Sequence, residues 1–386
     1  MASKPIVAVL YQALAPPVYG GVSKPQKPGG YRDSGADIAY TLSRTGTTVL
    51  TPVDSPDSAD QNHWCFPDTE DGILSAVQRG ATHLWANTVL FSGHPLQTSA
   101  QFTPFESRVR VIAQPPACVD RWDDKSVLND ALRRHGGLTL PRSWVIDHPQ
   151  LRSDDNASHS SPSSQGLDAV VASIPQTSYP IVAKPVRGRG SHGVKICQSA
   201  AEVTAHVTEL LDESPRVLLE EYLSGEEGTI TVMPPSNLPH ATHSHHWALP
   251  PVRRFNHVNG IAPYSGKVAV TSNSQAVSRA ERESDPAYAA IMRECEVVGD
   301  LLQTTAPLRI DIRRFGAESG FALFDVNMKP NITGPGRPGR EDQASLMGLA
   351  AEAVGWDYAM FLRTVLGSAR ELRQLRNYSC PLLAES

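Results

Sequence analysis

Short apolar runs alternate with amphipathic stretches along the first third of the chain. Each run has the length and composition of a buried strand, and Gly46 and Gly80 stand where the intervening helices would end. The predicted strands are 6–11, 47–53, 83–89 and 109–112, and the predicted helices are 36–44 and 71–79. Strands that alternate with helices are typical of a parallel sheet covered by helices, so an α/β domain is expected here.

The pattern becomes more varied after residue 116. A helix predicted at 126–135 begins behind Asp123-Asp124-Lys125 and ends at Gly136-Gly137. Residues 147–166 are rich in Ser, Asp, Asn and Pro, so we expect a mobile loop without chemistry there. The later predicted strands are 144–146, 181–183, 194–196, 217–221 and 229–232, and the later helices are 167–173, 199–211, 286–303, 342–354 and 357–373.

Residues 308–331 carry the clearest chemical pattern. Apolar runs at 308–312 and 321–326 flank a glycine-containing turn, which predicts a β-hairpin. Because side chains alternate along a strand, Arg309 and Asp311 share one face of the first strand, and Asp325 and Asn327 share one face of the second. Two carboxylates and a carboxamide suit Mg²⁺ or Mn²⁺ held against phosphate. The alternative is a hairpin with solvated charges.

A glycine-rich turn lies upstream, between two predicted strands. Residues 188–193 read GRGSHG and fit G-x-G-x-x-G, but a strand follows them where a dinucleotide site requires a helix. Glycines let a backbone lie close to phosphates, so we interpret the turn as a flap. Lys184 precedes it, and Lys125 lies in a first helical turn that favours an anion. A flexible hairpin and an ordinary surface lysine remain the alternatives.

Composition limits the remaining classes of function. The 386 residues carry a net charge of −5, which gives no indication of nucleic-acid binding. No run approaches the roughly 18 apolar residues of a membrane span. The five cysteines are scattered without metal spacing, as in a reduced cytoplasmic protein. The histidines at 240, 243, 245 and 246 have no cysteine nearby, so a zinc site is not favoured.

Taken in order, Lys125, Lys184 with its flap, the segment EEYLSGEE and the hairpin RID…FDVN resemble an ATP-grasp enzyme. The resemblance is to the D-alanine–D-alanine ligase branch of the carboxylate–amine ligases, and it runs from about Asp123 to Asn331. It implies an α/β chain with an ATP-grasp fold. The implied parts are an N-terminal parallel α/β domain at 1–120, a central lid at 121–222 and a C-terminal α+β domain at 223–386.

The resemblance also implies roles for individual residues. Lys125 and Lys184 would contact the α- and β-phosphates of ATP, while Ser191 and the flap backbone would close over the γ-phosphate. Arg309 would stabilise the acyl phosphate and the oxyanion, and Lys267 loosely matches a mobile-loop lysine. The implied nucleotide-binding residues are Lys125, Lys184, Gly190, Ser191, His192, Gly193, Glu220, Glu221, Tyr222, Leu223 and Glu227, with Glu227 on the ribose, and the implied ligands of Mg²⁺ or Mn²⁺ are Asp311, Asp325 and Asn327.

Several positions depart from the family pattern. Asp325 stands where the family usually has glutamate, and Asn331 replaces a glycine beside the acceptor. The N-terminal loop YQALAPPVYGGVSK does not reproduce the segment that holds the first D-alanine, so substrate identity does not transfer. A guanidinium group pairs with a carboxylate through two hydrogen bonds, so we expect arginines of the predicted hairpin and of the loop after it to bind the carboxylate of an acceptor. These candidates are Arg313, Arg314, Arg337 and Arg340.

The expected activity is an ATP-dependent ligase. It would join a small carboxylic acid or amino acid to the amine of an amino acid through an acyl phosphate, releasing ADP and phosphate. The alternatives are a nucleotide-binding regulator without ligation and a small-molecule kinase of the same fold. The expected partners are small carboxylates and amines, and neither nucleic acid nor a membrane is expected as a partner. The expected location is cytoplasmic. The oligomer considered is a homodimer.

Overall fold

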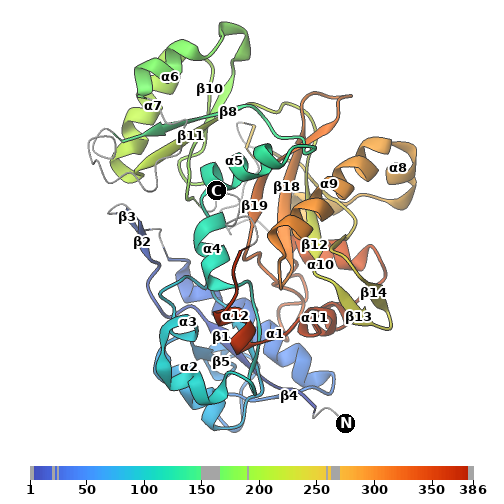
Figure 1. The fold of residues 1–386 in the computed structure, drawn as a ribbon. Coiled ribbons are helices and arrows are strands. Elements are labelled where there is room, and N and C mark those ends of the chain that lie inside the picture. The colour runs from blue at the N-terminus through green and yellow to red at the C-terminus, as the bar shows by residue number, and fades with distance from the viewer. Residues whose placement is uncertain are drawn as a thin grey trace.

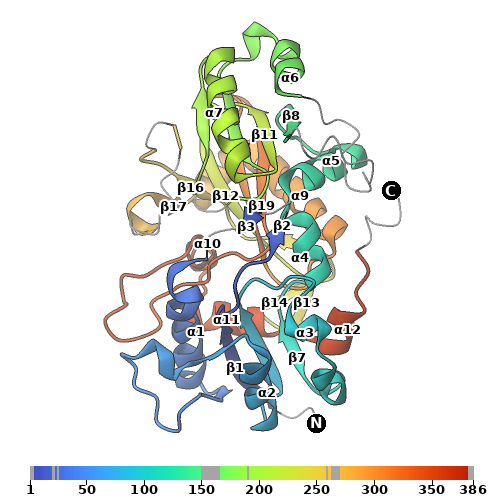
Figure 2. The ribbon, with the colours of Figure 1, turned by 90° about the vertical axis from the view of Figure 1, so that its left-hand side faces the viewer.

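The computed structural model describes residues 4–19, 22–23, 26–148, 166–188, 191–257, 260–261 and 270–380. Three bodies, each built on its own sheet, surround a common centre (Figure 1). The N-terminal body lies at the bottom of Figure 1, the lid with α6 and α7 at the top, and the C-terminal body to the right. Figure 2 shows that the lid stands over both other bodies, with β2 and β3 directed toward it.

The N-terminal body is the predicted parallel sheet. Its strand order is β20-β7-β6-β1-β4, and β5 also pairs with β1. Strand β1 is central because its apolar residues Val7 to Leu10 are fully buried. The bounds are β1 (Ile6–Tyr11), β4 (Thr48–Val49), β5 (Cys65–Pro67), β6 (His83–Asn87), β7 (Arg110–Ile112), α1 (Arg32–Arg44), α2 (Glu70–Gln78) and α3 (Pro95–Thr98).

The end of the chain returns to this sheet, which the sequence did not predict. The single helix expected at 357–373 is wrong: α11 (Tyr358–Leu366) ends at Gly367, and β20 (Arg370–Glu371) then pairs antiparallel with β7. Helix α12 (Leu372–Arg376) follows and places Leu372 and Leu375 in the N-terminal core. The open edge of β7 therefore overrides local helical propensity.

The lid is a four-stranded antiparallel sheet with the order β10-β9-β11-β8. Its apolar face packs on α6 and α7, as the shared core of Ile181, Val203 and Val207 shows. The bounds are β8 (Ser143–Asp147), β9 (Ile181–Pro185), β10 (Lys195–Cys197), β11 (Arg216–Glu221), α6 (Leu167–Ser173) and α7 (Ala200–Glu213). Most of the predicted loop at 147–166 lies outside the described residues.

The C-terminal body contains the predicted hairpin. Its sheet has the order β17-β16-β12-β18-β19, with β15 also on β12. Helices α4 (Pro116–Trp122) and α5 (Lys125–His135) join its core through Trp122, Leu128 and Leu132, so α5 begins beside the hairpin. The bounds are β12 (Glu227–Met233), β15 (Trp247–Ala248), β16 (Val252–Arg254), β17 (Ser274–Ala276), β18 (Leu308–Arg314), β19 (Phe321–Asn327), α8 (Arg279–Ser284), α9 (Pro286–Leu302) and α10 (Leu346–Glu352).

Two short hairpins complete the described strands. They are β2 (Val18–Tyr19) with β3 (Val22–Ser23), and β13 (Ser236–Leu238) with β14 (Ala241–His243). Within the described part of the chain, no helix is both long and apolar enough to cross a bilayer.

Candidate active site

The hairpin register places the predicted acidic residues face to face. Asp311 is the direct partner of Asp325 across the ladder, and Arg309 is the partner of Asn327. Opposed residues of an antiparallel pair share a face, so the predicted convergence is confirmed. The register then shifts, because Ile312 pairs with Leu323 and leaves Phe324 as a bulged residue. The strand pattern in the sequence did not predict this bulge.

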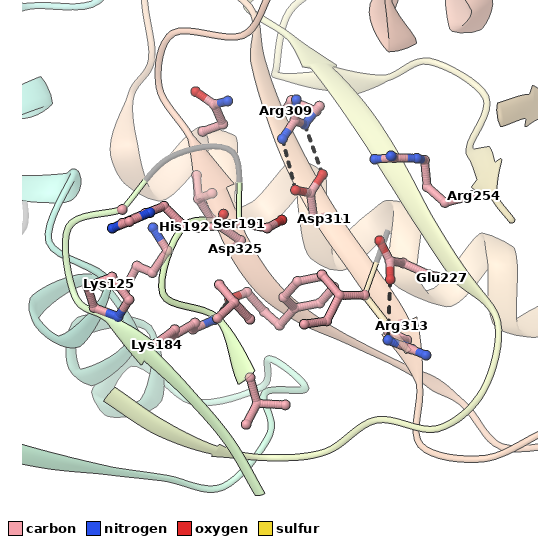
Figure 3. A pocket seen from close by; sticks show the side chains of 18 of the residues that line it. Lys125, Lys184, Ser191, His192, Glu227, Arg254, Arg309, Asp311, Arg313 and Asp325 are labelled. Carbon is pink, nitrogen blue, oxygen red and sulfur yellow. Dashed lines mark hydrogen bonds and ion pairs between the residues drawn. The ribbon is translucent and has the colours of Figure 1, made fainter. Parts of the chain in front are cut away.

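This face of the hairpin opens into a cavity of about 580 Å³ that all three bodies line. Figure 3 shows Lys125 of α5, Lys184 of the lid and the carboxylates of the hairpin pointing toward the same space. The site residues that line it are Lys125, Lys184, Ser191, His192, Glu220, Glu221, Tyr222, Leu223, Glu227, Arg309, Asp311, Asp325, Asn327 and Asn331. The structure therefore brings most of the predicted residues together.

Lys125 reaches the hairpin from the first turn of α5. Asp124 caps this helix by accepting hydrogen bonds from the backbone N–H groups of Ser126 and Val127. Lys125 Nζ then lies 3.3 Å from Asp325 Oδ1. Burial opposes the charge of Lys125, but nearby carboxylates, Asp325 foremost, outweigh it and raise the pKa of the ammonium group.

Asp325 has the complementary environment. Burial alone would raise its pKa, but Lys125, Lys184 and Arg309 outweigh that effect and lower the pKa of this carboxyl. Asp325 is therefore an anion in a cavity rich in cations. Such a carboxylate is ready to bind a cation when a second anion, such as a phosphate, engages the lysines.

Lys184 lies in a buried network at the end of β9. Its Nζ is 2.5 Å from Glu220 Oε2 and donates a 3.3 Å hydrogen bond to the carbonyl of Phe324, the bulged residue. Asn129 Nδ2 donates to the other oxygen of Glu220 at 3.0 Å. The bulge and Glu220 thus hold the Lys184 ammonium at the cavity wall.

Arg309 and Asp311 form a bidentate ion pair. Arg309 Nε and Nη2 each donate a 2.9 Å hydrogen bond to one oxygen of the Asp311 carboxylate, as Figure 3 shows. Asn327 Oδ1 accepts a 3.0 Å hydrogen bond from the backbone N–H of Lys329. The donor set is entirely oxygen, which fits Mg²⁺ or Mn²⁺. One of the three predicted ligands is the amide oxygen of Asn327. The described residues contain no cluster of three or more His, Cys, Asp or Glu side chains that could hold a metal, and a set of two carboxylates and one amide falls outside that definition.

The flap is described only in part. Ser191 and His192 line the cavity, whereas Gly190, like Lys267 of the later connection, lies outside the described residues. Gly193 has a φ of +70°, and a Cβ there would approach Leu210 Cδ2 within 2.8 Å. The glycine is therefore needed for packing the flap base on α7, and it does not line the cavity.

Glu227, the predicted ribose residue, already has basic partners. Its Oε2 accepts a hydrogen bond from His257 Nε2 at 2.9 Å. It accepts a second from Arg313 Nη1 at 3.3 Å, which Figure 3 shows. Arg313 also donates to the hydroxyl of Tyr222 at 3.2 Å. Arg313 therefore orients Glu227, the predicted ribose residue, and the expectation that it grips an acceptor stays a prediction.

The other predicted substrate arginines also have structural partners. Arg314 is paired with Asp285, and neither Arg337 nor Arg340 lines the cavity. Arg337 Nε donates to Asp37 Oδ1 at 2.9 Å, and Arg340 pairs with the same carboxylate through Nε and Nη2, both at 2.8 Å from their nearer oxygens. The prediction that Arg337 and Arg340 bind substrate is corrected: they fasten the loop after β19 to α1.

This three-residue cluster predicts a stability effect. Asp37 is fully buried, so replacing it removes the partner of two cations in a region of low polarity. We expect Asp37→Asn to lower the free energy of unfolding by about 3 kcal/mol, measured by urea denaturation. Asp54→Asn, at a fully exposed carboxylate, is the control. A loss no larger than that of the control would contradict the role assigned to Asp37.

The histidine group of the sequence is distributed among separate contacts. His246 binds Asp300 and the carbonyl of Thr304, and His240 contacts the hydroxyl of Thr364. His243 stacks on Trp247 with ring centroids 4.1 Å apart. These contacts position β13 to β15 and lie away from the cavity.

Some cavity residues were missed from the sequence. They are Lys27, Tyr31, Arg254, Asn273 and Lys329, which come from four separate segments. Lys329 lies two positions after Asn327, the last residue of β19, and that spacing was the signal available. The others reach the site only through tertiary packing.

Comparison with known proteins agrees with this geometry. A crystal structure of D-alanine–D-alanine ligase from Bacillus anthracis complexed with ATP matches with a TM-score of 0.59 at 15% identity, covering 97% of this chain and 99% of that one. A D-Ala:D-Ser ligase from Enterococcus faecalis matches with a TM-score of 0.61 at 12% identity, covering 95% and 99%. The three-body arrangement with its lid is therefore an ATP-grasp fold.

The sequence comparisons define the family. The family described as D-ala D-ala ligase C-terminus matches residues 150–366, more than half of the chain, and the chain belongs to this family. A D-alanine–D-alanine ligase from Gloeobacter violaceus is 26% identical over 187 residues, covering 48% of this chain and 54% of that protein. A phosphoribosylamine–glycine ligase from Xanthomonas axonopodis pv. citri is 26% identical over 212 residues, covering 53% and 44%. The chain spans about half the length of the curated relatives it matches.

Proposed function

We propose that this protein is an ATP-dependent carboxylate–amine ligase that forms ADP. The observation that carries the proposal is the pairing of Asp311 with Asp325 in one cavity with Lys125 and Lys184. Opposed carboxylates suit a divalent cation, and buried lysines suit the phosphates that such a cation would bridge. The names of the related ligases support the same class of reaction.

The proposed reaction has two steps. A carboxylate oxygen of the first substrate attacks the γ-phosphorus of ATP, and the bond to the β-phosphate oxygen breaks, giving an acyl phosphate and ADP. The nitrogen of an amine then attacks the acyl carbon, phosphate leaves with the bonding electrons, and the amine loses a proton. The product is an amide.

The residues of the cavity serve these steps by position and charge. Lys125 and Lys184 bind phosphate oxygens, and Arg309 stabilises the negative oxygen that forms on the acyl carbon. Mg²⁺ or Mn²⁺, held by Asp311, Asp325 and Asn327, would neutralise phosphate charge. Ser191 and His192, which line the cavity from the flap, would help to exclude water and so protect the acyl phosphate from hydrolysis.

The adenosine would lie between the lid and the C-terminal body. Residues 220–223 line that end of the cavity, and Glu227 is oriented there by His257 and Arg313. The substrates proposed are small carboxylates and amino-acid amines, as for the ligases named above. A cytoplasmic location and a homodimer are also proposals; the location is supported by the five buried free cysteines, which suit a reducing compartment.

The test is ADP release from Mg-ATP with pooled amino acids and simple carboxylic acids, followed by mass spectrometry. We expect a conjugate whose mass equals two pool members minus water, and we expect EDTA to abolish it. ADP release with neither a conjugate nor a hydroxamate in the presence of hydroxylamine would overturn the proposal in favour of a kinase. Tight ATP binding without any ADP release would instead indicate a regulator.

A further inference from the structure

Two lysines that line the cavity lie against one aromatic ring. Lys329 Nζ lies 3.4 Å from the centroid of the Tyr31 ring, and Lys27 Nζ lies 4.6 Å from it. All three residues line the same cavity as the hairpin carboxylates. The lysines come from segments 302 positions apart (329 minus 27), so only the fold brings them together.

Specific contacts hold this lysine pair in place. Lys329 Nζ donates a 3.1 Å hydrogen bond to Asn87 Oδ1, and Asn87 Nδ2 donates a 2.8 Å hydrogen bond to the carbonyl of Tyr31. Tyr31 adopts a φ of +64°, and the preceding Gly30 packs so tightly that a Cβ would lie 1.9 Å from the carbonyl oxygen of Gln12. The ring and both ammonium groups therefore belong to a built wall of the cavity.

The charge of this wall is positive. Among the described residues, the acidic residues that line the cavity are Asp123, Glu220, Glu221, Glu227, Asp311 and Asp325. Each of them already has a cationic partner, and those partners are Arg187, Lys184, Arg142, Arg313, Arg309 and Lys125 respectively. These carboxylates belong to the nucleotide and metal end of the cavity.

The carboxylate nearest the lysine pair does not cancel its charge. Asp33 lies 3.6 Å from Lys27, but it also interacts with Arg340 at 3.8 Å and is not part of the cavity lining. Asp33 and the buried Asp37 together face four cations, namely Lys27, Lys329, Arg337 and Arg340. Two ammonium groups close to one ring also repel each other, and an anion bound near both would relieve that repulsion.

We propose that the acid activated by this enzyme carries a second anionic group, which Lys27 and Lys329 bind. A short dicarboxylic acid is the simplest such substrate: one carboxylate faces the Asp311–Asp325 pair and takes the phosphoryl group, and the other faces the lysines. The ammonium group of a plain α-amino acid would be repelled at this wall. This inference rests on the proposed ligase function, and it concerns the acid, not the amine.

When hydroxylamine is the acceptor in every assay, differences in rate report on the acid substrate alone. We would measure hydroxamate formation with succinate and glutarate against butyrate and alanine, in wild-type protein, Lys27→Met and Lys329→Met. Because each lysine would donate a hydrogen bond to a charged group, each variant is expected to raise the KM for the dicarboxylate about 10- to 100-fold, which corresponds to about 1.4–2.8 kcal/mol. The KM for ATP should stay unchanged. Lys4→Met, at an exposed lysine outside the cavity lining, is the matched control.

Several results would overturn the inference while leaving the ligase function intact. These are equal kcat/KM for butyrate, alanine and the dicarboxylates, unchanged KM values in both variants, or an effect that appears only when an amino-acid amine replaces hydroxylamine. If no acid gives a hydroxamate, the ligase proposal fails. Calorimetry with succinate and a Mg-bound, non-hydrolysable ATP analogue then tests the anion site by itself: binding that is lost in Lys329→Met supports a site for a second anionic group at the lysines, and absence of binding to the wild-type protein overturns it.

Discussion

Asp311→Asn is expected to lower the rate of ADP formation about 10³-fold or more, which corresponds to about 4 kcal/mol of transition-state stabilisation. Asp311 faces Asp325 directly across the hairpin, so the substitution removes one of two opposed carboxylates. An amide keeps the shape but supplies no negative charge to a divalent cation. The cation would then be bound weakly or placed wrongly, and the phosphoryl group would lose its main neutralising partner.

Steady-state ADP release at saturating Mg-ATP measures this effect. Nucleotide binding should persist, because Lys125, Lys184 and residues 220–223 are unchanged, and it can be measured separately by calorimetry. Asp212→Asn, at an exposed residue of α7, is the matched control and should retain full activity. Activity of Asp311→Asn within tenfold of the control would show that this carboxylate does not bind an essential metal.

Local sequence pattern was sufficient for the elements that form the reactive face. The alternation in 308–312 and 321–327 predicts both strands of the hairpin, and the face shared by Asp311 and Asp325 follows from the period of two. The cap at Asp124 and the glycines after His135 likewise predict α5, and hence the position of Lys125. These features depend on neighbours in sequence, which is why they could be predicted.

Features that depend on distant segments could not be predicted in this way. The arginine-rich loop after β19 seemed suited to a substrate carboxylate, but Asp37 of α1, 300 positions away from Arg337, already binds its guanidinium groups. The bulge at Phe324 and the pairing of β20 with β7 also depend on tertiary partners. Periodicity cannot indicate which carboxylate a given arginine will meet. The predicted domain limits at residues 120 and 222 stay predictions.

Because Arg309 is paired with Asp311, replacing Arg309 is expected to change both kcat and the Mg²⁺ requirement. Replacing Arg309 by Met is expected to lower kcat about 10³-fold, because the group that we propose to stabilise the developing oxyanion is lost. The same guanidinium donates two 2.9 Å hydrogen bonds to Asp311 and therefore competes with a metal for that carboxylate. Its removal should leave Asp311 more available to Mg²⁺.

The variant should consequently be slow while needing less metal. We expect the Mg²⁺ concentration for half-maximal ADP formation to fall in Arg309→Met, about tenfold if the competition contributes about 1.4 kcal/mol. Arg309→Lys keeps the charge but not the two-pronged geometry, so it should be intermediate in both quantities. A purely structural role for Arg309 would lower stability and raise the metal requirement. Loss of kcat with an increased Mg²⁺ requirement would therefore contradict the assignment of Arg309 as an oxyanion-stabilising residue that is held by Asp311 until metal binds.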